Sequence, residues 1–149
     1  MKPTKTWIVV TDGGGMRVFL NDGPGHGVSE LEELARSNAV KPARDVNADK
    51  PGRVFDRGGE GRHAMEPEVD VKEHERQTFM KEVAEFLSKE AHKGSYDRLI
   101  LVAPPKSLGD LRRKLAKPAA EKISAELSKD LIHLEARELA GHLGDVLAV

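Results

Sequence analysis

The chain has no cysteine, so disulfides, thiolate metal sites and a cysteine nucleophile are excluded. It also lacks long hydrophobic runs. None approaches the length of a transmembrane helix, and the run near the N-terminus is too short for the core of a signal peptide. We therefore expect a cytoplasmic protein that has no membrane partner.

An excess of charge of one sign is missing as well. The net charge is -1, although charged residues make up 33% of the sequence. Binding to nucleic acid through overall charge is therefore not indicated, and we expect no DNA partner; a basic surface would have to be local. The 149 residues are enough for one domain with a single sizeable core, so we take 1–149 as one domain.

The N-terminal part predicts a β-hairpin. Residues 6–12 and 15–21 are rich in β-branched and apolar side chains, and the intervening Asp-Gly-Gly-Gly supplies the backbone freedom that a tight turn needs. The segment VSELEELA that follows fits a helical period, although a third strand completing a meander remains open.

A long segment without any period comes next, over about 37–68. A loop of about thirty residues is unusual in a compact domain and indicates function or disorder. A strong helix is expected to begin at Asp70, where Asp70 and Glu73 form a capping-box pattern, and to end at Gly94.

The C-terminal third predicts further strands and helices. A buried strand is expected over 97–103, a short helix over 107–114, and a second helix from Pro118 that buries Ile123 and Leu127. Residues 130–135 alternate as a strand, and 139–147 form a last helix. The fold class is therefore α/β, an α+β sandwich with a mixed β-sheet.

The long loop holds the candidate site. Gly58, Gly59 and Gly61 surround Glu60, which allows the backbone to approach a substrate closely and to point N–H groups at it. Guanidinium and ammonium groups beside it suit a phosphate-rich partner, and the candidates are Lys50, Arg53, Arg57 and Arg62. A polar loop whose charges are merely solvated is the competing interpretation.

Histidines and carboxylates after the glycines form a second constellation. It consists of His63, Glu66, Asp70, Glu73 and His74. Two imidazoles and a carboxylate can hold a divalent metal, which makes His63 and His74 weak metal candidates. The spacing matches no zincin motif, and local turn, capping and packing roles are favoured. We expect no metal and no cofactor.

Other residues give weaker signals. Asp12 in the hairpin turn suits a nuclease of ribonuclease H-like fold, but a turn aspartate bonded to its own backbone is far commoner. Ser107 lacks the histidine and aspartate context of a nucleophile. A local basic cluster could touch RNA or could be a solvated helix face; its members are Lys106, Arg112, Arg113, Lys114 and Lys117.

Four longer stretches carry a resemblance. The run DKPGRVFDRGGEGRHAMEPEVDVKEHE, together with VTDGGGMRVFL and YDRLILVAPPKSLGDLR, resembles the bacterial family described as "protein required for attachment to host cells". The SKDLIHLEARELAGHL tail fits the same family, so the resemblance covers nearly the whole chain.

That family is similar to the middle domain of the archaeal and eukaryotic class-1 peptide release factors. The similarity implies a sheet, a long helix and, just before the helix, a Gly-Gly-Gln loop that helps a water attack the peptidyl-tRNA ester. Gly58 and Gly59 match the two glycines, and Glu60 takes the glutamine position. Arg57 and Arg62 resemble residues that contact ribosomal RNA.

The resemblance implies a ribosome or tRNA partner and makes Gly58, Gly59 and Glu60 candidate catalytic residues. We add His63, close by in the sequence, to the candidate catalytic set. The chain has no room for the codon-reading and partner-binding domains of a full release factor. Rescue of stalled ribosomes by ester hydrolysis, or action on free peptidyl-tRNA, is therefore the expected function. An indirect role in attachment to host cells and a non-catalytic RNA-binding module are the alternatives.

Overall fold

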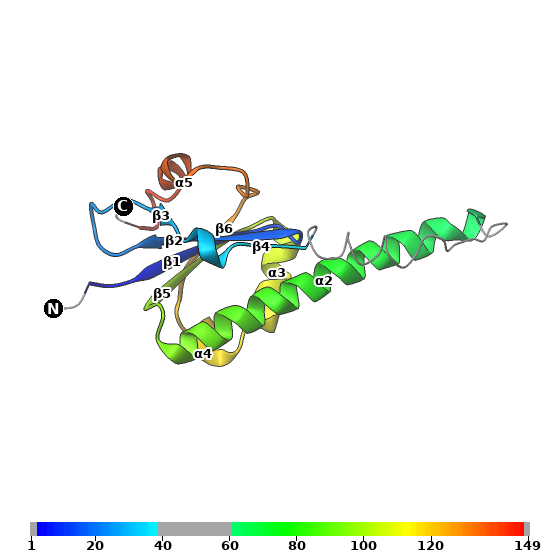
Figure 1. The fold of residues 1–149 in the computed structure, drawn as a ribbon, viewed down its shortest axis with the longest axis horizontal. Helices are drawn as coiled ribbons and strands as arrows, with labels where there is room; N and C mark the ends of the chain where they lie inside the picture. The colour runs from blue at the N-terminus through cyan, green and yellow to red at the C-terminus, as the bar shows by residue number, and fades with distance from the viewer. Residues whose placement is uncertain (1–2, 39–60, 148–149) are drawn as a thin grey trace.

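The fold is built on a mixed six-stranded sheet. In this computed structural model, residues 3–38 and 61–147 are described, and over 61–70 the backbone alone is described. The strand order is β3-β2-β1-β5-β6, with β4 paired to β2 (Figure 1). The expected α/β fold class with a mixed sheet is confirmed.

The N-terminal hairpin is confirmed. Strands β1 (Thr6–Thr11) and β2 (Gly15–Asn21) pair antiparallel, with Thr6 opposite Asn21 and Thr11 opposite Met16. Gly13 in the turn has a φ of 95°, a conformation that residues with a side chain rarely adopt. The turn therefore depends on the glycines that the sequence places there.

Strand β1 is covered on both faces. Trp7 and Val9 belong to one core cluster, whereas Ile8 and Val10 belong to the other. Successive side chains of a strand point to opposite faces, so a continuous apolar run suits a strand buried on both sides. Strand β5 (Arg98–Ala103) pairs parallel with β1 and shares this character.

Helices cover both faces of the sheet. The long helix α2 (Gly61–Lys93), with α3 (Pro105–Lys114) and α4 (Lys117–Ala120), lies on one face, and α5 (Ala136–His142) lies on the other (Figure 1). The buried side of α2 consists of Phe79, Met80, Val83, Ala84, Leu87 and Ala91. Burying each of the larger of these side chains contributes about 1.5–3 kcal/mol.

Aromatic side chains surround the C-terminal part of α2. The Trp7 ring lies 6.1 Å from the Phe86 ring and 4.9 Å from the Tyr96 ring, measured between centroids. The Tyr96 hydroxyl donates a 2.8 Å hydrogen bond to the Leu87 carbonyl, and burial raises the pKa of Tyr96. Gly94, at a φ of 79°, ends the helix as expected.

The expected start of this helix at Asp70 was wrong. Helix α2 begins at Gly61, so Asp70 and Glu73 lie inside it and form no capping box. The helix also runs through Pro67. Helix formation is cooperative, and once the packed half is formed each further residue adds a hydrogen bond, which offsets the cost of one proline.

The segment after the hairpin combines both expected alternatives. It contains a short strand β3 (Ser29–Glu30), a single 3-10 turn η1 (Glu32–Leu34) and a short strand β4 (Arg36–Ser37). Both strands pair with β2, so a meander is present, and the helical period corresponds to the 3-10 turn alone.

Two C-terminal expectations were wrong. The helix that starts near Pro118 ends at Ala120, and Ile123 and Leu127 lie on strand β6 (Ile123–Ser128), parallel to β5. Residues 130–135 form no strand. The last helix, α5, begins at Ala136 rather than at Leu139 and ends at His142.

Arg17 explains how residues 130–135 are held without a strand partner. Its Nη1 donates to the carbonyls of Ile132 at 2.7 Å and Leu134 at 2.6 Å. Its Nε and Nη2 donate to the two carboxylate oxygens of Glu30 at 2.9 and 2.8 Å. This pairing raises the pKa of Arg17 and lowers that of Glu30. One guanidinium thus connects β2, β3 and the segment before α5.

We expect Arg17→Lys to destabilise the fold by about 1.5–3 kcal/mol, because an ammonium cannot donate to the carboxylate and both carbonyls in this fork geometry. Urea unfolding would measure the loss. Arg137→Lys is the matched control, since Arg137 is exposed. Equal unfolding midpoints for the two variants would contradict the assigned role of Arg17.

Candidate functional site at the base of helix α2

The first turns of α2 extend beyond the folded body. Figure 1 shows the helix leaving the side of the sheet near α3 and continuing away from it. No residue from 71 to 78 is buried, and Val71 is 54% exposed; within residues 71–93, Phe79 is the first buried residue. Part of α2 is therefore not needed to cover the core, which makes it available for contacts with another molecule.

The candidate catalytic triplet directly precedes this extension. Gly58, Gly59 and Glu60 lie outside the described residues, as do Lys50, Arg53 and Arg57. Because α2 begins at Gly61, the triplet is adjacent in sequence to the first residue of the helix. Arg62 and His63 belong to the first turn of α2, where the backbone alone is described. Their functional roles stay predictions.

A cluster of charged residues lies where α2 leaves the body. Arg76 of α2 donates from Nη2 to Glu73 Oε2 at 2.6 Å and from Nε to Glu73 Oε1 at 3.3 Å. Its Nη1 forms an ion pair with Asp110 Oδ2 of α3, and the side chain of Asp110 is only 4% exposed. Arg113 binds the other carboxylate oxygen of Asp110. The cluster thus joins α2 to α3.

The hairpin turn closes against this cluster. A Cβ placed on Gly13 would lie 2.7 Å from Arg76 Cγ and 3.5 Å from Ser107 Oγ. The glycine is therefore required by close approach as well as by its φ of 95°. Ser107 is buried beside this turn, which agrees with the absence of a nucleophile signal in the sequence.

Asp12 has the turn role that the sequence favoured. Its Oδ1 accepts hydrogen bonds from the backbone N–H groups of Gly14 and Gly15, both at 2.9 Å. A carboxylate oxygen used in this way shapes the turn. The nuclease interpretation gains no support.

The interpretation of the histidines and carboxylates as a metal site also gains no support. Within the described residues, no group of three or more His, Cys, Asp or Glu side chains is arranged to hold a metal ion. His74 is exposed on α2, and Glu73 is engaged with Arg76 and with Gln77, whose Nε2 donates at 2.9 Å. The side chain of His63 lies outside this test.

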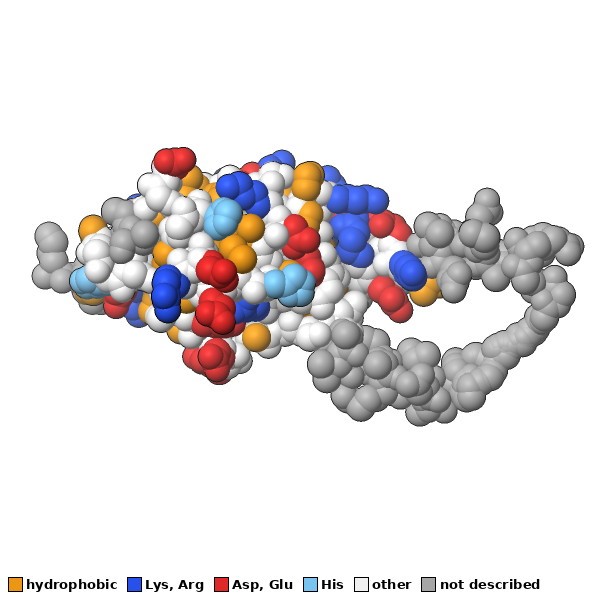
Figure 2. Space-filling view, turned by 90° about the horizontal axis from the view of Figure 1, so that it is seen from above, with side chains coloured by type: hydrophobic (Ala, Val, Ile, Leu, Met, Phe, Trp, Pro, Cys, Tyr) orange, Lys and Arg blue, Asp and Glu red, His pale blue; other side chains and the backbone are white. Residues whose placement is uncertain are grey.

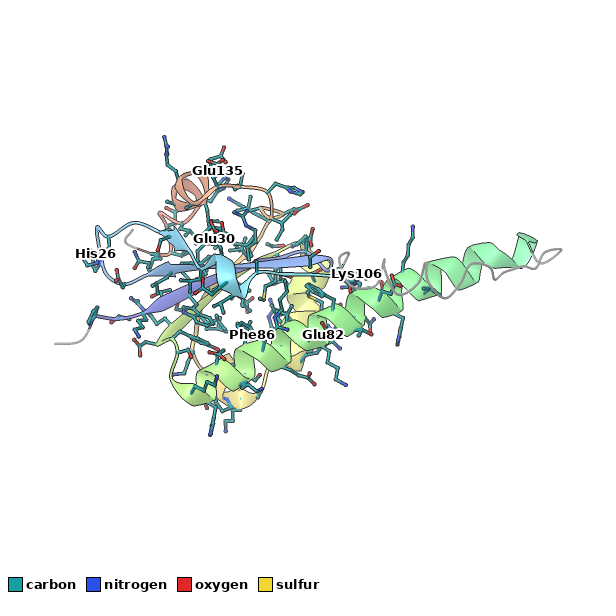
Figure 3. All side chains as sticks on the ribbon, viewed as in Figure 1. His26, Glu30, Glu82, Phe86, Lys106 and Glu135 are labelled. Atoms are coloured by element: carbon teal, nitrogen blue, oxygen red, sulfur yellow. The ribbon has the colours of Figure 1, made fainter. Side chains whose placement is uncertain are left out.

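The basic cluster of α3 and α4 is partly neutralised within the fold. Lys106 Nζ lies 3.5 Å from Glu73 Oε1, Arg112 Nε donates to Glu126 at 3.1 Å, and Arg113 pairs with Asp110. Figure 3 places Lys106 beside α2 where the helix leaves the body. The ion pairs of Lys106, Arg112 and Arg113 favour a solvated helix face over an RNA-binding surface. Figure 2 shows the opposite side, that of α5, where both basic and acidic side chains lie on the surface.

Comparison with known proteins identifies the family. The family described as "Protein required for attachment to host cells" matches residues 7–143. The chain belongs to this host-attachment family. The resemblance noted from the sequence is thereby confirmed. Another similar protein is the uncharacterised protein RP470 of Rickettsia prowazekii, 28% identical over 105 residues; the match covers 69% of this chain and 63% of that protein.

The fold of this chain is similar to that of an archaeal translation termination factor, aRF1. The match covers 96% of this chain and 35% of the factor, with a TM-score of 0.56 and 13% identity. At this identity the likeness concerns the fold alone. This chain thus spans about a third of the length of the factor.

None of the helices within 3–38 and 61–147 combines the length and the apolar character that crossing a bilayer requires.

We expect Gly13→Ala to destabilise the fold by more than the roughly 1–2 kcal/mol that a left-handed backbone costs a residue with a side chain. The Cβ would also displace the stem of Arg76, since the two lie 2.7 Å apart. Thermal unfolding would measure the effect. Gly14→Ala is the matched control, because the nearest atom to its added Cβ is 3.8 Å away. Equal melting temperatures for the two variants would refute the close packing of the turn.

The charge cluster predicts a pH dependence. Hydrogen bonds from Arg76 and then Gln77 lower the pKa of Glu73 from 4.5 to about 2. A depressed carboxylate pKa stabilises the fold above the unfolded value of 4.5, and this contribution is lost as the pH falls toward 2.

We therefore expect wild type to be more stable than Glu73→Gln by a constant amount above about pH 5.5, and this difference to shrink between pH 4.5 and 2. Urea unfolding at several pH values would test this. Glu75→Gln, a nearby exposed carboxylate, is the control. A difference that does not change with pH would show that Glu73 keeps an ordinary pKa.

Proposed function

We propose that this protein acts at the ribosome as a rescue factor that hydrolyses the ester of peptidyl-tRNA with its Gly58–Glu60 loop. The observation that carries the proposal is the fold likeness to a translation termination factor over 96% of the chain. The position of the triplet supports it, since Gly-Gly-Glu directly precedes a helix that extends beyond the body, as Gly-Gly-Gln precedes the long helix in the release factors that the family resembles.

The chemistry would depend on backbone groups. A water oxygen adds to the ester carbonyl carbon, the ester C–O bond breaks, and a water proton passes to the leaving ribose oxygen, which becomes a hydroxyl. Backbone N–H groups exposed by Gly58 and Gly59 can stabilise the negative charge that develops on the carbonyl oxygen. Nearby cationic side chains, Arg57 and Arg62, would bind RNA phosphates.

Glu60 is the departure from the release-factor pattern. A carboxylate about 4 Å from a developing oxyanion costs on the order of 1–4 kcal/mol at a protein surface. The same carboxylate can act as a general base on the attacking water. The two roles predict opposite effects of Glu60→Gln, which raises the rate in the first case and lowers it in the second.

Release of labelled peptide from stalled ribosome–peptidyl-tRNA complexes tests the proposal. We expect release by wild type and a loss of at least about a hundredfold in Gly59→Ala, as for removal of an oxyanion donor. Gly141→Ala is the matched control, because Gly141 is exposed and its added Cβ would meet nothing within 4 Å. Full activity of Gly59→Ala would overturn the assignment.

A non-catalytic ribosome-binding module is the second candidate, and the charge of Glu60 favours it. It predicts ribosome binding by every variant and peptide release by none. The family description favours a third, an indirect role in attachment to host cells. That role would be supported if the protein bound no ribosomes and deletion of its gene still lowered attachment to host cells.

A further inference from the structure

Over residues 71–78, helix α2 forms two ion pairs with α3 in the described part of the chain, Arg76 with Asp110 and Glu73 with Lys106. Within residues 71–93 of α2, the buried apolar residues begin at Phe79, and none lies between 71 and 78. The Lys106 pair is the weaker of the two, because the Lys106 side chain is 72% exposed.

The Arg76–Asp110 pair is different because both partners are sheltered. Their side chains are 17% and 4% exposed. Arg76 Nη1 and Asp110 Oδ2 are buried, and neither has another hydrogen-bond partner in the described part of the chain. Arg113 also binds Asp110, but it lies on the same helix and is 70% exposed, so it cannot join α3 to α2. Arg76 makes this connection.

The Arg76 side chain is enclosed by three elements. Glu73 on α2 holds the outer guanidinium nitrogens, Asp110 on α3 holds Nη1, and Gly13 in the hairpin turn packs against the methylene stem. A guanidinium bound this way has one orientation, because its planar fork matches the carboxylates only in that geometry. The enclosure therefore sets the direction of α2 at the exit point.

The direction of α2 at Arg76 matters because the displacement caused by a change in angle grows with distance along the extension. At 1.5 Å per residue, the helix from Arg76 to Gly61 is on the order of 20 Å long, so a change in direction of about 10° moves its first residue by roughly 4 Å. Catalytic groups lose activity when displaced by about 1 Å.

We propose that Arg76 is a positioning residue which, held by Asp110 and the Gly13 turn, fixes the direction of the α2 extension. This inference rests on the proposed function for its consequence in catalysis, but its structural part can be tested without ribosomes.

Spin-label distances test the structural part in the full chain. Since the sequence has no cysteine, labels attach only at introduced positions. The pair Val71→Cys and Ser124→Cys reports the direction of α2 relative to the sheet, whereas Val71→Cys and Lys89→Cys reports the helix itself; all three residues are exposed. Each pair is measured by double electron–electron resonance in wild type, Asp110→Asn and Arg76→Gln.

Arg112→Gln is the matched control, because it removes an ion pair of the same helix, with Glu126, that does not involve α2. We expect one narrow helix-to-sheet distribution in wild type and in the control. In Asp110→Asn and Arg76→Gln it should broaden or shift by several ångströms, while the distance within the helix is unchanged. If Asp110→Asn fails to fold, the helix-to-sheet distance in Arg76→Gln, a substitution at the edge of the buried site, tests the proposal. Distributions like that of wild type, or broadening within the helix as well, would overturn the proposal.

Peptide release tests the consequence. We expect Arg76→Gln to lower the maximal rate at least tenfold while the half-saturating ribosome concentration changes less than about threefold, because positioning affects the chemical step more than binding. Unchanged release despite a shifted distance would overturn the link to catalysis. If wild type releases no peptide, the proposed function fails, and the distance measurement still decides the role of Arg76.

Discussion

The structure depends on how α2 is attached. Its C-terminal half buries an apolar face against the sheet, from Phe79 to Ala91, while its first turns extend beyond the body. Burial of those side chains, surrounded by Trp7 and Tyr96, supplies the free energy that keeps the whole helix formed. An extension of this kind is possible because helix propagation costs little once the packed part exists.

The charged cluster at the exit point completes this attachment in a different way. Apolar contacts hold the helix on the sheet without specifying a direction sharply, whereas the enclosed guanidinium of Arg76 accepts one geometry. A buried carboxylate such as Asp110 is costly unless it is paired, so it is more useful for specificity than for stability. Arg17 has a comparable role on the opposite face, where it holds the segment before α5.

The sequence predicted the elements whose signal is local. The hairpin, strand β5 and the end of α2 at Gly94 followed from β-branched runs and glycines. The start of α2 was missed because Pro67 and the glycines indicate a break, and cooperativity with the packed half overrides them. Strand β6 was missed because Ile123–Ser128 is only partly apolar and needs β5 as its partner.

The candidate loop residues and the family were recognisable from the sequence, because the glycines, the arginines and the specific motif depend only on residue identity and order. The sequence by itself therefore determined the hairpin, the apolar faces and the family to which the chain belongs. Only the tertiary structure decided that Arg76, Asp110 and Gly13 meet, since they lie on three elements that the sheet and α3 bring together. In the sequence, each of the three looks like an ordinary charged residue or turn glycine. An ion pair between residues far apart in the sequence produces no periodic pattern that could reveal it.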